Sequence, residues 1–294
     1  YNYEELLELR KDENLDAQNQ LPVREVRHAR NQKHMDALAE KIAEVDPDIL
    51  VVVGDDQHEW FQEDIQPSFT VFYGDQVINT ALDQEKVKSM QPGLAISMRA
   101  NHPDEDQAYP VPSALSRAII EQAMEDEFDV ATSSEHPTNE KGLIGVGHAV
   151  GFIYRRILRD KPVPVVPILL NTFFPPNQPT PRRCYKFGQC IGRAIQGWNG
   201  DKRVAICASG GISHFVIDED FDNRMLTAMR ERDEDTIFNE PNAMFRSGTS
   251  ETKNWITVAG IMSETERSME LHAYVPCYRS EAGTGSGMAF ATWS

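Results

Sequence analysis

The apolar positions of this chain fall into two patterns, short continuous runs and longer stretches with helical spacing. Continuous aliphatic runs occupy Ile49–Val53, Val163–Leu170 and Arg203–Ala208, and shorter ones occupy Phe69–Tyr73 and Phe128–Ala131. Runs that are apolar on both faces are typical of strands covered on both sides. The pattern therefore predicts a central sheet flanked by helices.

Helical spacing separates these runs. Met35, Leu38, Ile42 and Val45 recur at intervals of three and four residues, which predicts a helix over residues 24–45 that stops before Pro47. The same reasoning predicts helices at Tyr3–Leu9, from Ser113, and over 144–158, 179–198, Glu219–Arg232 and 250–264. We expect residues 96–112 to be irregular. Two late strands are expected at His272–Tyr278 and Met288–Trp293.

The alternation of strands and helices predicts an α/β fold with a central mixed sheet and helices on both faces. The chain has 294 residues and shows no repeat and no clear linker. We therefore expect a single domain over residues 1–294.

Composition narrows the function. Hydrophobic residues make up 40% and charged residues 26%, which is typical of a globular protein. The net charge is −17, whereas a nucleic-acid-binding surface is normally basic, so no nucleic-acid partner is expected. No apolar run reaches the ~18–20 residues that cross a bilayer, so no membrane partner is expected either. The spacing of the four cysteines fits no zinc site or disulfide framework, which predicts reduced thiols and a cytoplasmic location.

Titratable residues follow the predicted strands, where ligand sites of α/β sheets form. DILVVV is followed by GDDQHEW. This makes His58 a candidate metal ligand, with Asp55 and Asp56 as residues that could orient it. A surface turn with a capping aspartate is the alternative interpretation.

The strand RVAICA is followed by SGGISH. Gly210 and Gly211 permit a tight turn and the close approach of a ligand. Ser213 and His214 follow, and an imidazole at this position can act as a general acid or base near neutral pH. The alternative is a helix-capping loop with an incidental histidine.

Two further candidates lie near predicted helix starts. Glu251, in SGTSETKNW, belongs to a first helical turn, where an acidic residue also offsets the helix dipole. His148, in GLIGVGHAVGF, is a second catalytic candidate on a loop that enters a helix. The alternative for His148 is a hydrogen-bonded core histidine.

Taken together, ASGGISH, SGTSETKNWI and the tail YVPCYRSEAGTGSGMAFATW resemble the catalytic subunit of class III extradiol ring-cleaving dioxygenases. Protocatechuate 4,5-dioxygenase and gallate dioxygenase belong to that family. NTFFPPNQPTPRRCYKFG is similar to another of its segments, and the resemblance runs from about residue 24 to the C-terminus. It implies an oxidoreductase of aromatic compound catabolism that binds Fe(II), an aromatic substrate and O2. In such enzymes two histidines and one carboxylate hold the iron.

The resemblance also implies roles by position. Glu251 matches the carboxylate ligand and His214 the acid/base, while His58 is the nearest match to one histidine ligand. Aligned without gaps, Gln57 occupies that histidine's place. The other histidine ligand belongs to a Ser-His-x-Pro segment, which we expect upstream of Tyr1 because the sequence has no starting Met.

Further expectations concern the substrate and the assembly. Gly211 and Ser213 would contact the substrate, Arg182 or Arg183 would pair with a substrate carboxylate, and Tyr278 would line the pocket or a subunit contact. A homo-oligomer is expected. Two alternatives stay open: a hydrolase or lyase of the same fold acting on an aromatic or keto-acid substrate, and a non-catalytic subunit with an incomplete metal triad.

Overall fold

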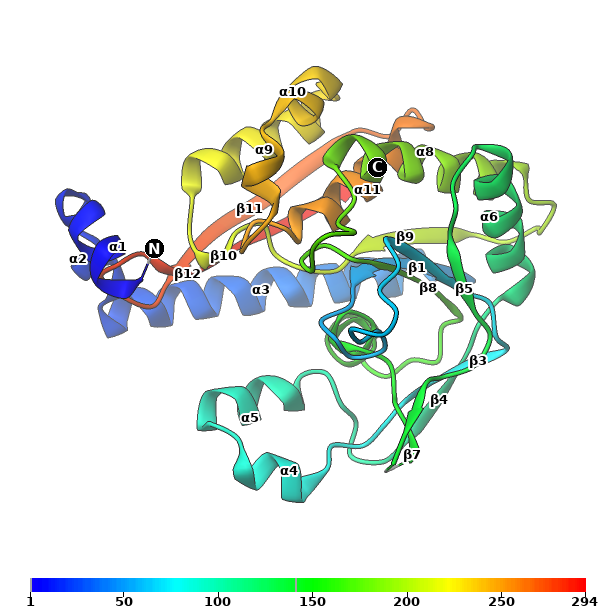
Figure 1. The fold of residues 1–294 in the computed structure, drawn as a ribbon, viewed down its shortest axis with the longest axis horizontal. Coiled ribbons are helices and arrows are strands. Elements are labelled where there is room, and N and C mark those ends of the chain that lie inside the picture. Colours follow the sequence, from blue (N-terminus) through cyan, green and yellow to red (C-terminus); the bar gives the residue numbers. More distant parts are fainter. Residues whose placement is uncertain (1, 141) are drawn as a thin grey trace.

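A five-stranded sheet lies at the centre of the computed structural model, which describes residues 2–140 and 142–294 (Figure 1). Its strand order is β5-β2-β8-β1-β9. β1 pairs in parallel with β8 and β9, whereas β2 runs antiparallel to β8 and parallel to β5. The strands are β1 (Ile49–Asp55), β2 (Phe69–Phe72), β5 (Ala131–Ser133), β8 (Val165–Leu170) and β9 (Val204–Ala208). The predicted mixed sheet of an α/β fold is confirmed.

The buried strand β1 explains why its sequence is aliphatic on both faces. All seven of its residues are buried. Val51 and Val53 belong to a core cluster shared with several helices, and Leu50 and Val52 belong to a second cluster on the other face. The first cluster draws on α6 (Ser113–Glu125), α8 (Pro181–Gly197) and α11 (Thr252–Ser263), and the second on α7 (His148–Phe152) and the π-helical turn Ile153–Ile157. Alternate side chains of one strand therefore hold both helical layers.

A second, three-stranded sheet in the order β10-β12-β11 carries the C-terminal end of the chain. The long helix α3 (Leu21–Val45) contacts both β11 and β12 and runs alongside them in Figure 1. The strands are β10 (His214–Val216), β11 (Met269–Tyr278) and β12 (Thr284–Trp293). β10 brings the segment that follows β9 into this sheet.

The remaining elements are short. The helices are α1 (Tyr3–Leu9), α2 (Leu15–Asn19), α4 (Gln84–Ser89), α5 (Pro92–Arg99), α9 (Glu219–Glu231) and α10 (Glu234–Asn239), with single turns at Lys11–Glu13 and Asn242–Phe245. The strand pairs are β3 (Gln76–Asn79) with β4 (Gln107–Pro110), and β6 (Thr138–Asn139) with β7 (Gly142–Leu143). None of the described helices is long and apolar enough to cross a membrane.

Two local predictions differ from the structure. Residues 96–112 are not irregular, because α5 ends within them and β4 pairs with β3. That partner lies about thirty positions earlier, so the pairing has no local signature. The expected strand at Phe128–Ala131 forms at Ala131–Ser133 instead, while Phe128 packs in the core.

Helices α8 and α11 approach so closely that only glycine fits at two positions. A Cβ atom on Gly188 would lie 2.0 Å from the carbonyl oxygen of Thr257, and one on Gly260 would lie 2.1 Å from that of Tyr185. The backbones of the two helices are therefore in direct contact, and α8 fixes the position of α11. This contact matters for function because the start of α11 reaches the candidate site described below.

We predict that Gly188→Ala destabilises the protein by about 1–3 kcal/mol, the cost typical of an overpacked contact. Alanine would otherwise favour a helix over glycine by about 1 kcal/mol. Gly197→Ala is the matched control, because Gly197 ends the same helix and a Cβ atom there meets nothing within 4 Å. Urea unfolding measures both variants. Equal midpoints for the two would contradict the proposed close contact.

Candidate active site

The candidate site forms around Asp55, the last residue of β1. Its side chain is 1% exposed. Its carboxylate accepts hydrogen bonds from Gln57 Nε2 at 2.6 Å, from Asn254 Nδ2 at 3.1 Å and from the Thr172 hydroxyl at 3.4 Å. Thr172 follows β8 and Asn254 lies on α11, so three separate segments meet on one buried carboxylate. Bonding of this kind is what a buried charge requires.

Two hydrogen bonds join the loop after β9 to the start of α11. Asn254 Nδ2 also donates to the Ser209 carbonyl at 2.9 Å, and Trp255 Nε1 donates to the Gly210 carbonyl at 2.9 Å. Gly210 has a φ of +120°, and a Cβ atom there would lie 2.8 Å from Glu251 Oε2. Glycine is therefore needed at this position for both the backbone conformation and the approach of Glu251.

Glu251 faces His214 across this loop, with 3.3 Å between Oε2 and Nε2. Glu251 occupies the N-cap position of α11 without using its side chain as a cap. Burial lowers the pKa of His214 below its usual value. Burial, and then the negative charge of Asp55, raise the pKa of Glu251. Both groups are therefore driven toward their neutral forms.

His148, the first residue of α7, has the opposite environment. Its Nδ1 lies 3.0 Å from Glu59 Oε2, and its backbone amide donates to Glu59 Oε1 at 2.6 Å. Burial alone would lower the pKa of His148, but Glu59, followed by the charges of Asp55 and Glu251, raises it to about 10. His148 Nε2 lies 3.9 Å from Asp55 Oδ1. The imidazole is therefore cationic beside two carboxylates.

Glu59 was missed by the sequence reasoning. It lies one residue after His58, but its partner is 89 positions away. The sequence carries no periodicity or spacing that links the two. The only signal in the sequence is a weak one, namely an acidic residue four positions beyond the end of β1.

His58 lies at the same edge of the sheet but in different surroundings. Its backbone is left-handed, with a φ of 58°, and its ring stacks on Phe174 with 3.6 Å between centroids. Its Nε2 is buried and has no hydrogen-bond partner among the residues that the structure describes. The Nδ1 of His214 is in the same condition. Unpartnered imidazole nitrogens are unusual in a protein interior and are suited to binding a further group.

The charges of these residues bear on whether the site could hold a metal ion. Asp55 and Glu251 bring two buried carboxylates close enough for Asp55 to raise the pKa of Glu251, an arrangement that a cation would relieve. Within residues 2–140 and 142–294, however, no group of three or more His, Cys, Asp or Glu side chains is placed to hold a metal ion. The described residues thus fit a cation in charge and supply part of a ligand set.

Other residues predicted for the site have different contacts. Gly211 lies against the His214 ring, since a Cβ atom there would be 3.0 Å from Cε1. Ser213 donates to the buried Asp222 at 2.6 Å. The Arg182 guanidinium lies over the Phe238 ring, and Arg183 over Phe69 and Phe128. The Tyr278 hydroxyl donates to Glu219, and its ring lies under Arg10.

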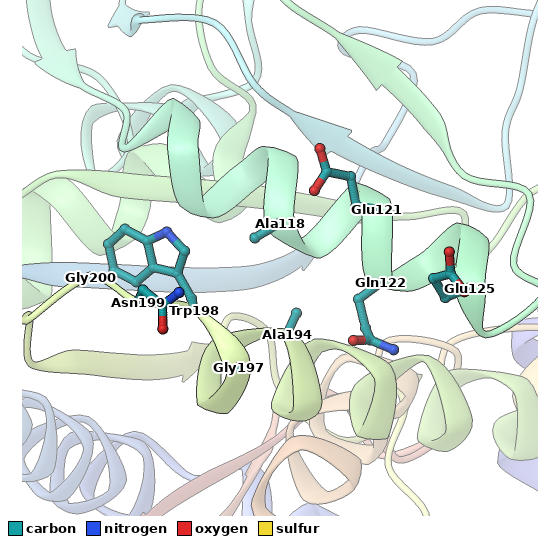
Figure 2. A pocket seen from close by; sticks show the side chains of 9 residues that line it. All are labelled: Ala118, Glu121, Gln122, Glu125, Ala194, Gly197, Trp198, Asn199 and Gly200. Atoms are coloured by element: carbon teal, nitrogen blue, oxygen red, sulfur yellow. The ribbon is translucent and has the colours of Figure 1, made fainter.

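A separate hollow lies away from this site (Figure 2). It measures about 690 Å³ and is lined by Ala118, Glu121, Gln122, Glu125, Ala194, Gly197, Trp198, Asn199 and Gly200. Residues 198–200 lead into β9, so the hollow lies near the amino end of that strand. The candidate site lies at the carboxyl ends of the strands, where ligands of α/β sheets bind.

Comparison with known proteins identifies similar enzymes. A gallate dioxygenase of Pseudomonas putida is 39% identical over 106 residues, which cover 35% of this chain and 29% of that enzyme. A 2,3-dihydroxyphenylpropionate/2,3-dihydroxicinnamic acid 1,2-dioxygenase of Cupriavidus necator is 25% identical over 178 residues, or 60% of this chain and 47% of that enzyme. The matched part of the chain thus spans less than half the length of either relative.

The family comparison covers far more of the chain. Residues 23–285 match the family described as the catalytic LigB subunit of aromatic ring-opening dioxygenase. This range includes His58, His148, His214 and Glu251 as well as the whole central sheet. The chain therefore belongs to the LigB family of aromatic ring-opening dioxygenase catalytic subunits.

Proposed function

We propose that this chain catalyses the Fe(II)-dependent extradiol opening of a catechol- or gallate-like ring, with both atoms of O2 inserted. The observation that supports this most is the pair of histidines driven in opposite directions, neutral His214 and cationic His148, beside the buried carboxylate of Asp55 and the largely buried carboxylate of Glu251. Such a pair supplies a base and an acid at the same pH. Family membership supports the aromatic substrate.

Glu251 and His58 are the residues that we propose as iron ligands. Glu251 offers a buried carboxylate, and His58 offers a buried Nε2 without a partner. When bound, Fe(II) would let electron density pass from the catecholic ring to O2 and would orient both. The third protein ligand stays a prediction from the family resemblance.

The proton chemistry belongs to residues of the chain. His214 is neutral, so its imidazole can accept a proton from a substrate hydroxyl. His148 carries a proton held in place by Glu59, and its Nε2 points toward Asp55. His148 can donate that proton, or stabilise negative charge that develops on the ring oxygens.

The proposal also covers the location of the protein in the cell and its assembly. Cys184, Cys190, Cys207 and Cys277 are free thiols, which supports a cytoplasmic location. Assembly as a homo-oligomer stays a prediction from the sequence.

We expect the purified, Fe(II)-loaded protein to consume O2 when catechol or gallate is added. Glu251→Gln should lower both iron content and O2 uptake. Loss of a residue that only orients a metal ligand typically costs roughly 10–100-fold, and we expect the loss of a ligand itself to cost more. Glu266→Gln, at an exposed position, is the control. An oxygen electrode and metal analysis measure the two effects. The proposed function fails if the loaded protein consumes no O2 with any catechol.

We predict that His214→Gln lowers kcat by about 10²–10⁴-fold, the usual contribution of a general acid or base. Glutamine keeps a polar group of similar reach but cannot accept and release a proton near neutral pH. His28→Gln, at an exposed position on α3, should leave kcat unchanged. Equal kcat values for the His214 variant and the wild type would show that His214 is not the general base.

Glu59→Gln should move the alkaline limb of the pH profile. The pKa of His148 is raised, so its proton is present at neutral pH and is lost only as the pH rises through about 10. Removing the Glu59 charge should lower that pKa by about 1–3 units, and kcat should fall at correspondingly lower pH. Glu63→Gln, at an exposed position nearby, is the control. An unmoved alkaline limb would show that His148 is not the acid.

A further inference from the structure

Four rings form a continuous row beside the candidate site. His58 stacks on Phe174 with centroids 3.6 Å apart, Phe174 meets Phe173 edge-on at 5.2 Å, and Phe173 meets Phe215 edge-on at 6.2 Å. We call these four residues the aromatic row. They come from three segments, namely the loop after β1, the loop after β8 and strand β10. Distant parts of the chain therefore converge to place rings side by side.

The row is attached to the groups of the candidate site. Phe173 directly follows Thr172, which donates to Asp55. Phe215 directly follows His214, and a Cβ atom on Gly248 would lie 3.1 Å from Phe215 Cδ2. The Gly248 carbonyl oxygen accepts a hydrogen bond from the His214 backbone amide at 2.7 Å, and Gly248 lies three residues before Glu251. The exposed end of the row thus borders the proposed base and the proposed carboxylate ligand.

Both ends of the row have backbone conformations that residues with side chains rarely adopt. Phe215 has a φ of 64° and His58 a φ of 58°. For a bulky residue such as Phe215, a left-handed backbone departs from the usual conformations, and strain of this kind concentrates at ligand-binding sites. In a regular strand, Phe215 would point to the face opposite His214. Its left-handed backbone departs from that alternation, and its ring meets Phe173.

One end of the aromatic row is open to solvent. The Phe215 side chain is 58% exposed, although it belongs to a strand and is entirely apolar. Phe173 and Phe174 are partly exposed. The folded chain therefore leaves aromatic surface uncovered next to its proton-transfer groups. A flat aromatic ligand would cover that surface with favourable ring contacts, whereas a saturated ring would not gain them.

We propose that the aromatic row binds the ring of the substrate, and that Phe215 is a specificity-determining residue that selects planar aromatic diols over saturated ones. This inference rests on the proposed function for the kind of substrate, and it adds the surface that recognises the ring. Phe215 and Phe173 contact the ring, while His214 acts at its oxygens.

The test is equilibrium binding of catechol to the Fe(II)-loaded protein under argon, where no O2 is available for turnover. Phe215→Leu keeps an apolar side chain but removes the ring, and should weaken catechol binding by about 2- to 10-fold. Phe215→Tyr keeps the ring and should restore wild-type affinity. Tyr3→Leu removes another exposed ring, on α1, and is the control. Calorimetry with catechol and with trans-1,2-cyclohexanediol gives the affinities.

The outcomes separate this inference from the proposed function. Catechol binding that weakens in Phe215→Leu supports the aromatic row, even if the wild type consumes no O2 and the dioxygenase proposal fails. Equal catechol affinity in Phe215→Leu and the wild type would overturn the inference, and so would wild-type binding of cyclohexanediol as tight as that of catechol. Absence of catechol binding to the wild type would overturn it as well.

Discussion

Burial of negative charge at the end of the central strand is the constraint on which the site depends. Asp55 is 1% exposed, and a carboxylate removed from water to that degree needs hydrogen-bond donors around it. Gln57, Thr172 and Asn254 supply them from three different segments. These bonds hold the loops after β1 and β8 to the start of α11. The same carboxylate then raises the pKa of both Glu251 and His148.

The two histidines differ because of the charges around them, although they share a residue type and are both partly buried. Burial alone lowers the pKa of an imidazole, and His214 follows that rule. His148 departs from it because Glu59 holds its Nδ1 and its amide together. The candidate site thus contains a neutral imidazole, His214, and a cationic imidazole, His148, at the same pH. Acid and base chemistry of this kind requires the groups to be kept in separate environments.

The fold could be read from the sequence where local pattern and burial agree. The aliphatic run at Ile49–Val53 became the central strand, and the helical spacing over residues 24–45 became α3. The prediction was wrong at 96–112, because β4 depends on a partner strand rather than on its own residues. The meeting of Asp55 and His214 at one edge of the sheet could also be anticipated, since both follow predicted strands. In a parallel βαβ arrangement the carboxyl ends of the strands meet at the same edge.

The sequence by itself determined the α/β class, the strongly negative net charge and the identity of the residues that could carry chemistry. Periodicity, charge and motifs are local properties, so one chain is enough to read them. Only the tertiary structure decided that Glu59 holds His148, that Gly210 makes room for Glu251, and that Phe173 meets Phe215. Each of these contacts joins residues more than 40 positions apart. Their protonation, strain and exposure arise from packing, which no local pattern records.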